Sequence, residues 1–256
     1  MIIYNETRAQ FLDDVFQNCL RQRLIDSFRT MTNSVPADQS VWDYEYLNWL
    51  DDVLQIRETD NFDSWGDLQY EFKVFDDASE LYETLKARNS ENRARLVAGY
   101  SWEWPTDERG RGTTATHVRA DGLALPWNFD TGYWATAEDG ITHVECVHTI
   151  QGLEFDWLGV LIGNDLVVRG DKVTGDPERR AKTDASLKGW KKDLKNAAGN
   201  PKRQQEVMDR VDSIIKSTYK VLLSRGRRGC FVWCADPSLR DYLKTRIAML
   251  GKPTAE

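Results

Sequence analysis

Two short segments combine residue types that can do chemistry with a backbone that can present them. The first, VHTIQGLEFD at residues 147–156, places an amide, a glycine and a carboxylate in one turn, at Gln151, Gly152 and Glu154. The second, SRGRRG at residues 224–229, contains three arginines and two glycines. The planar fork of arginine suits phosphate oxygens, and the glycines let the backbone come close. The second segment therefore favours contact with an anion.

Each segment also has a plainer interpretation. A tight turn whose glycine tolerates positive φ and whose glutamate is solvated would show the first pattern, and the pattern alone favours neither interpretation. Cations at the C-terminus of a helix complement its dipole without binding a ligand. That role would account for one of the three arginines.

The hydrophobic pattern predicts an α/β fold, with a mostly parallel sheet covered by helices on both faces. Apolar runs and alternation predict strands at 71–75, 95–100, 141–147, 157–162 and 230–234. Three- and four-residue spacing predicts helices at 8–31, 42–55, 76–89, 178–196, 202–223 and 237–249. Residues 101–140, with seven Gly or Pro, are expected to form a long insertion with little strand.

The predicted topology gives an expected place for the first segment. In an open parallel sheet, ligands bind at the carboxyl ends of the strands. Because the turn at 151–154 follows the strand predicted at 141–147, we expect it at that edge.

Composition and charge restrict the function classes. The chain has 256 residues and a net charge of -7, but residues 1–165 carry 13 Lys and Arg against 30 Asp and Glu, whereas residues 166–256 carry 21 against 11. This asymmetry suggests that the C-terminal third meets an anion. No apolar run reaches the roughly 18–20 residues of a membrane helix, and the first residues lack the basic start of a signal peptide.

The remaining residue types argue against other chemistries. The four cysteines are scattered without a C-x-x-C pair, which disfavours a zinc site and fits a reducing cytoplasm (Cys19, Cys146, Cys230 and Cys234). No Ser-His-Asp or H-E-x-x-H pattern occurs. Adjacent aspartates such as Asp51 and Asp52 would point apart on a helix. A hydrolase unrelated to phosphate chemistry is therefore a weak hypothesis.

The two segments together resemble the fifth and sixth motifs of superfamily 1 helicases, in the second RecA-like domain. The stretch from about Asp43 to Leu243 resembles the C-terminal part of a bacterial family of Schlafen-group-3-like DNA/RNA helicases, through FDDASELYETLKARNSENRARLVAGYSWEW, HTIQGLEFDWLGVLIGNDLVVRGDKV and YKVLLSRGRRGCFVWC. Residues 1–42 resemble the start of full-length members. The resemblance implies an N-terminal helical segment at 1–42 and a single RecA-like domain at 43–256.

The resemblance also implies residue roles. Gln151, Gly152 and Glu154 would lie at a nucleotide, with Glu154 on the ribose hydroxyls. Arg225 would act as an arginine finger on the γ-phosphate, in trans across a cleft, and Arg228 would belong to the same nucleotide site. Such a finger contributes roughly 10³–10⁵ in rate in NTPases.

The resemblance places the nucleic-acid side just before the first turn, at His148 and Thr149. Arg29, in LIDSFRT, faintly resembles the arginine of the fourth motif, but it falls in the helix predicted at 8–31, and we do not assign it this role.

One departure from the family limits these roles. A motor of this kind needs a P-loop, G-x-x-x-x-G-K-[ST], whose amides and lysine hold the phosphates. The chain has no such pattern, and no apolar strand in the right place ends in Asp-Glu to hold Mg²⁺. Relatives use ATP and Mg²⁺; we expect this chain alone not to hydrolyse ATP.

Two classes of function remain open. The first is a degenerate helicase half that binds nucleotide, DNA or RNA, or a P-loop-containing partner domain, with no membrane association. The second is a non-enzymatic regulator or decoy of a full-length relative, in phage defence for example. Lysines at 188–195 and Arg225–Arg228 favour nucleic acid, although charged helix faces are commonly only solvated.

Overall fold

The structure is a computed structural model that describes residues 39–59, 70–103, 116–127 and 134–250. The chain divides into two units, Met1–Tyr44 and Glu45–Glu256. The start of one helix is described in the first unit, and the fold below is that of the second. The helix predicted at 8–31 lies outside the described residues.

The described elements follow one another as alternating strands and helices. In chain order they are α2 (Gln39–Val53), β1 (Glu71–Phe75), α3 (Ala78–Ala87), η2 (Ser90–Asn92), β2 (Ala94–Ala98), β3 (Val118–Ala120), β4 (Leu123–Leu125), η3 (Glu138–Thr142), β5 (Val144–Glu145), α4 (Val147–Ile150), β6 (Phe155–Ile162), β7 (Leu166–Arg169), β8 (Lys172–Gly175), η4 (Pro177–Arg179), α5 (Trp190–Asn196), α6 (Pro201–Leu223), β9 (Gly226–Cys234) and α7 (Pro237–Ala248).

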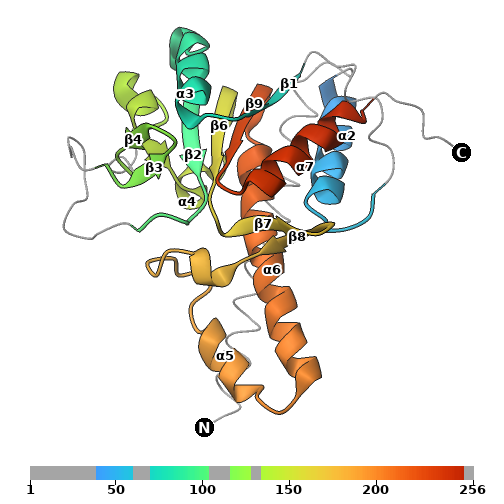
Figure 1. The fold of residues 1–256 in the computed structure, drawn as a ribbon. Helices are drawn as coiled ribbons and strands as arrows, with labels where there is room; N and C mark the ends of the chain where they lie inside the picture. The colour runs from blue at the N-terminus through green and yellow to red at the C-terminus, as the bar shows by residue number, and fades with distance from the viewer. Residues whose placement is uncertain (1–38, 60–69, 104–115, 128–133, 251–256) are drawn as a thin grey trace, which may run out of the picture. The chain divides into compact units, whose positions relative to one another are not determined.

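A five-stranded parallel sheet organises the second unit (Figure 1). Its strand order is β1-β9-β6-β2-β5, and each neighbouring pair is parallel. The central strand β6 has five consecutive buried residues at its end, as expected for a strand covered on both faces. The predicted α/β class and mostly parallel sheet are confirmed.

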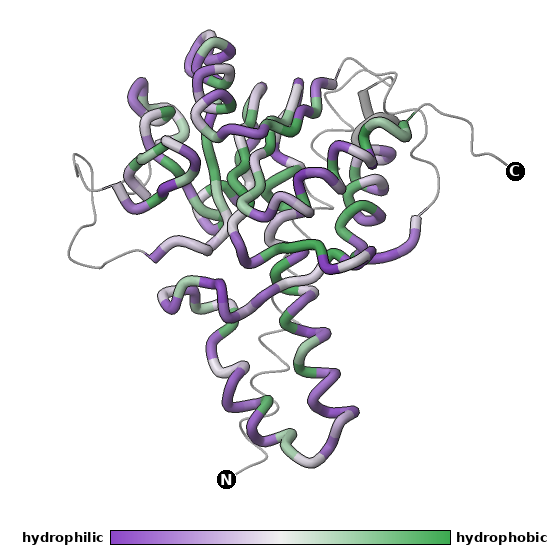
Figure 2. Tube along the Cα trace, in the orientation of Figure 1, coloured by the Kyte–Doolittle hydropathy of each residue, from purple (hydrophilic) through white to green (hydrophobic). Residues whose placement is uncertain are grey.

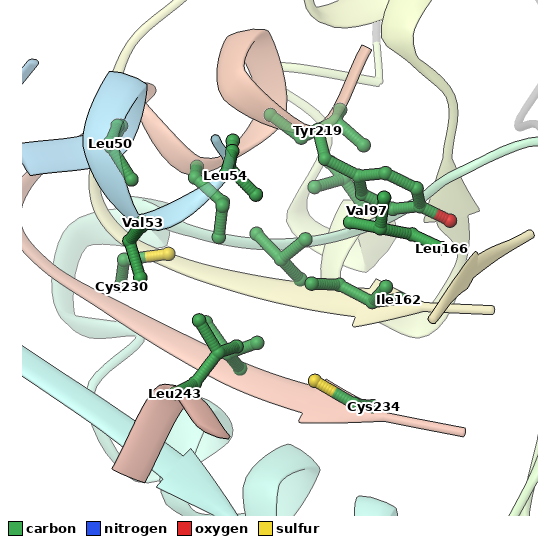
Figure 3. Packing of buried hydrophobic residues seen from close by; sticks show 14 of the residues in the cluster. Leu50, Val53, Leu54, Val97, Ile162, Leu166, Tyr219, Cys230, Cys234 and Leu243 are labelled. Carbon is green, nitrogen blue, oxygen red and sulfur yellow. The ribbon is translucent and has the colours of Figure 1, made fainter. Parts of the chain in front are cut away.

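Two hydrophobic clusters lie on the two faces of this sheet. On one face, α2, α6 and α7 pack over the strands, and Figure 3 shows Leu50, Tyr219 and Leu243 from these helices in one cluster with Ile162 and Cys230. On the other face, α3 and the β3–β4 hairpin contribute a second cluster. Figure 2 shows the strands as a largely hydrophobic layer inside this arrangement.

Helix α6 shows why the sequence forms these layers. Asn200 caps its first turn by accepting a hydrogen bond from the Arg203 N–H, and Pro201 occupies the first helical position. Its buried residues recur at steps of three and four along one side, at Val211, Ile215, Tyr219, Leu222 and Leu223. Burial of each such side chain stabilises the fold by about 1.5–3 kcal/mol.

Two predicted elements are wrong in part. The strand predicted at 141–147 is reduced to Val144–Glu145, because Val147 and Ile150 turn into the core at helical spacing and form α4. The helix predicted at 178–196 is helical at Trp190–Asn196, with a 3-10 turn at Pro177–Arg179. Between these pieces, Arg180 and Asp184 are buried in ion pairs, and this arrangement replaces a continuous helix.

Candidate functional site

The two motif segments lie side by side at the amino ends of β6 and β9. Phe155 is paired with Gly226 in the sheet, and the Phe155 N–H donates to the carbonyl oxygen of Arg225 at 3.0 Å. The prediction that the 151–154 turn lies at the carboxyl ends of the strands is therefore wrong. The chain returns past α4 from β5 before it enters β6, so the turn lies at the opposite edge.

The structure brings Arg225 and Glu154 together. The Arg225 guanidinium is partly buried, and its Nε has no hydrogen-bond partner among the described residues. Burial lowers the pKa of Arg225, and the charge of Glu154 partly offsets that effect. A buried guanidinium N–H without an acceptor costs free energy. An anion approaching this edge would relieve that cost.

A β-bulge exposes the other two arginines of the segment. The pairing of β6 with β9 shifts between Phe155 and Trp157, where Asp156 of β6 lies opposite two residues of β9. Arg227 and Arg228 are both exposed there. The Arg228 Nε lies 3.8 Å from Asp156, a carboxylate that also pairs with Arg93 at 2.9 Å.

The glycines of the two segments serve different purposes. Gly152 is exposed with φ of 80°, and a side chain added there would meet nothing within 4 Å, so the turn needs its backbone conformation. A Cβ on Gly226 would lie 2.2 Å from the Gly229 carbonyl oxygen, and one on Gly229 would lie 2.5 Å from Trp157. These two glycines make room for the chain's own atoms.

His148 and Thr149 do not join this group. Both side chains are exposed, and the His148 ring lies 5.6 Å from that of Tyr100, beyond the carboxyl end of β2. Gln151 is partly buried in the turn that follows α4. The structure thus gathers Glu154, Arg225 and Arg228 at one edge and leaves His148 toward the other.

Helix α2 contacts the last turn of α6, the segment that immediately precedes Arg225. The Tyr46 hydroxyl donates to the Leu223 carbonyl oxygen at 2.9 Å, and Lys220 forms an ion pair with Asp51. Asp51 also pairs with Arg57 at 2.6 Å. The sequence did not reveal the contacts of α2 with α6, because the Tyr46–Leu223 and Asp51–Lys220 pairs each join residues more than 160 positions apart.

The carboxyl ends of the strands carry a different arrangement. Asp165, fully buried after β6, accepts from Ser101, from Tyr219 and from Arg180, the last at 3.0 Å. Arg180 also pairs with Asp184 at 2.7 Å. Burial works against the charge of Arg180, but the two carboxylates outweigh it and raise its pKa. Burial, followed by Asp165, raises the pKa of Tyr219 well above its ordinary value.

The chemistry of Glu154 and Arg225 suits groups with exposed oxygen atoms. An arginine with an unused N–H beside a carboxylate suits phosphate and hydroxyl groups. In the described part of the chain, no group of three or more His, Cys, Asp or Glu could hold a metal ion. These residues could therefore hold a phosphate group.

Comparison with known proteins identifies the family. Residues 39–236 match the family described as Schlafen group 3, DNA/RNA helicase domain. The chain belongs to the Schlafen group 3 family of helicase domains. It is also similar to the uncharacterized protein YPL245W of Saccharomyces cerevisiae, at 26% identity over 227 residues, which cover 82% of this chain and 45% of the yeast protein. No solved structure matches the chain significantly.

The family match includes both motif segments. The 151–156 turn and the 225–229 loop fall within the matched residues of this Schlafen group 3 domain. The chain spans less than half the length of its yeast relative. Among the described residues, no helix is long and apolar enough to span a membrane.

Proposed function

We propose that this chain forms one half of a nucleotide cleft, and that a P-loop-containing domain outside these 256 residues forms the other half. The observation that carries the proposal is the Nε of Arg225, which lies beside Glu154 where β6 and β9 begin and has no hydrogen-bond partner among the described residues. Arg225 would neutralise phosphate charge, and Glu154 would accept hydrogen bonds from ribose hydroxyls. Arg228 would add charge at the rim of the same edge.

The chain by itself is proposed not to hydrolyse ATP. Hydrolysis needs a phosphate cradle and a metal in addition to the arginine, and the sequence contains no P-loop. Phosphate release from ATP and Mg²⁺, measured with and without DNA or RNA, tests this. We expect background release only; robust release that Arg225→Met abolishes would contradict the proposal.

Nucleic-acid contact at His148 and Thr149 remains part of the proposal. Both side chains are exposed on α4, just before the 151–154 turn, where a nucleic-acid strand could reach them. A His148→Ala, Thr149→Ala double variant should weaken any nucleic-acid stimulation of a completed cleft, without altering basal phosphate release. Unchanged stimulation would remove these two residues from the proposal.

A further inference from the structure

Arg95 is a buried cation close to the amino ends of β6 and β9, and the proposed half cleft gives it no role. It lies on β2, next to β6 in the sheet, and its side chain is fully buried. Burial lowers its pKa to about 10, an effect that the charge of Asp139 only partly offsets, so the guanidinium is still protonated at neutral pH. A buried charge is costly unless it is hydrogen-bonded and paired. The contacts of Arg95 must therefore explain its position.

The guanidinium of Arg95 donates to uncharged oxygen atoms of two chain segments. Its Nε donates to the Trp134 carbonyl oxygen at 3.2 Å, and its Nη2 donates to those of Ala135 and Ala137 at 2.9 and 3.0 Å. Its Nη1 donates to the carbonyl and side-chain oxygens of Asn92 at 3.0 and 2.9 Å. One side chain thus joins the start of β2 to a segment that follows it by 39 to 42 residues.

Asn92 binds the same distant segment a second time. Its side-chain nitrogen donates to the carbonyl oxygens of Thr136 and Ala137 at 3.0 and 2.8 Å. Glu91 and Asn92 have φ of 54° and 59°, in the left-handed region that residues other than glycine adopt at a cost. Such strain persists where surrounding contacts enforce it, and it is concentrated at functional sites. The turn before β2 is therefore shaped to reach residues 134–137.

The segment held by Arg95 and Asn92 packs against Phe155. The rings of Trp134 and Phe155 meet edge to face, with centroids 5.3 Å apart and planes at 72°. The Arg95 guanidinium carbon lies 5.6 Å from the centre of each ring. A Cβ on Gly140 would lie 2.4 Å from the Trp134 carbonyl oxygen and 2.8 Å from the Arg95 Nε, so a side chain there would disrupt this contact.

Phe155 connects this packing to the two residues that we propose to contact a ligand. It directly follows Glu154 in the chain, and its N–H donates to the Arg225 carbonyl oxygen. The next residue, Asp156, accepts a hydrogen bond from the Arg93 side chain, and its N–H donates to the Arg93 carbonyl oxygen at 3.0 Å. A shift of the Phe155 ring would therefore move the backbone that carries Glu154 and change its distance from Arg225.

We propose that Arg95 is a positioning residue for the half cleft. It holds Trp134 against Phe155. This contact fixes where Glu154 and Arg225 lie relative to each other. The consequence for nucleotide rests on the proposed function, whereas the placement of the two residues is a property of this chain alone. A guanidinium suits this task because its donors lie in a rigid plane and reach several carbonyl groups at once, whereas a lysine ammonium carries all its donors on one nitrogen.

Hydrogen exchange measured by mass spectrometry on Arg95→Lys tests the placement without nucleotide or partner. Peptides that cover residues 151–156 should exchange about tenfold or more faster than in the wild type, because looser packing of Phe155 makes local opening easier. Peptides that cover residues 160–164, at the other end of β6, should be unchanged. Arg119→Lys, at an exposed arginine of β3, is the matched control and should change neither. Equal acceleration in both peptides, or none in either, would overturn the proposal.

Asn92→Gly is a second variant that keeps the test valid if Arg95→Lys does not fold. Glycine adopts the left-handed conformation at no steric cost, so this substitution removes the side-chain hydrogen bonds and leaves the backbone unstrained. The peptides of residues 151–156 should again exchange several-fold faster, while those of residues 160–164 keep wild-type rates. Wild-type exchange in both would show that the held segment does not control the turn, and would overturn the proposal.

A further measurement tests the consequence at the half cleft. A P-loop-containing relative whose own motif arginine has been replaced is titrated with this chain, and phosphate release from ATP is measured. Arg95→Lys should lower the maximal rate about tenfold to a hundredfold, because a misplacement of about 1 Å has effects of that size. The chain concentration that gives half-maximal release should stay near the wild-type value, whereas mere loss of folded protein would raise it.

The two measurements separate this proposal from the proposed function. An unchanged maximal rate with Arg95→Lys would overturn the role of this residue at the half cleft. If the wild-type chain itself restores no release, the proposed function is wrong, and the exchange of residues 151–156 alone then decides whether Arg95 positions Glu154 and Arg225.

Discussion

Arginines lie at both edges of the sheet, but their partners differ. At the carboxyl edge Arg180 is 3% exposed and is held between Asp165 and Asp184. At the amino edge Arg225 has a buried Nε with no acceptor in the described residues, next to the single charge of Glu154. A buried charge that is fully paired serves the scaffold, whereas one left partly unsatisfied is available to a ligand. This difference marks Arg180 as a structural residue, whereas Arg225 is the residue that we propose to contact a ligand.

Breaking the closed network should give the largest effect. Arg180→Met leaves Asp165 and Asp184 buried without their cation, which should lower the free energy of unfolding by about 3–5 kcal/mol. Urea unfolding measures this loss. The neighbouring exposed Arg179→Met is the control and should stay within about 0.5 kcal/mol of the wild type. Equal values for the two variants would show that the network does not stabilise the fold.

Removing one hydroxyl from the same network should cost less. In Tyr219→Phe, Asp165 loses one donor and the Gly163 N–H loses an acceptor at 3.1 Å. Hydrogen bonds to charged groups contribute about 1.5–3 kcal/mol. Tyr242→Phe removes two part-buried bonds, one to the Val53 carbonyl oxygen and one from Arg246, and leaves no buried carboxylate without a donor, so it should cost less than Tyr219→Phe. If Tyr242→Phe proves the more damaging substitution, the proposed importance of Asp165 is wrong.

Gly229, at the amino edge, tests whether a glycine there is needed for packing or for the approach of a ligand. Gly229→Ala places a Cβ against Trp157 and 2.6 Å from the Glu71 carbonyl oxygen, and overpacking of this kind costs about 1–3 kcal/mol. Thermal unfolding of this variant is compared with that of Arg227→Ala, an exposed neighbour expected to be neutral. A stable Gly229→Ala protein would mean that the glycine is kept for a reason other than packing.

The smallest effect on stability is expected at Arg225. Burial already lowers the pKa of Arg225, and its Nε has no partner in the described part of the chain, so Arg225→Met should change the free energy of unfolding by less than about 1 kcal/mol. The same substitution at Arg180 and Arg225 thus compares the two edges directly by urea unfolding. A loss at Arg225 as large as that at Arg180 would make both arginines structural.

The sequence predicted those parts of the fold that depend on local pattern. The strand at 71–75 and the helix at 237–249 follow from apolar runs, caps and prolines within a few residues, and the structure contains both as Glu71–Phe75 and Pro237–Ala248. The grouping of Arg225 with Glu154 came from family resemblance, not from spacing, since the two residues are 71 positions apart.

The errors arose where distant residues decide the structure. Arg180 turns inward because it donates a hydrogen bond to Asp165 at the end of β6, and Tyr219 on α6 donates to the same carboxylate. Nothing near residue 180 in the sequence reveals these two residues. The edge at which the 151–154 turn lies depends on how α4 crosses the sheet after the short β5. Both features require the tertiary arrangement of segments that local periodicity cannot supply.

The central claim is that Arg225 completes a nucleotide site formed with another domain. The direct test uses a P-loop-containing Schlafen group 3 relative whose own motif arginine has been replaced, and measures phosphate release on adding this chain. Since an arginine finger is worth roughly 10³–10⁵ in rate, the wild-type chain and its Arg227→Ala variant should restore release well above background, and Arg225→Met should not. No restoration by the wild type, or equal restoration by Arg225→Met, would contradict the account.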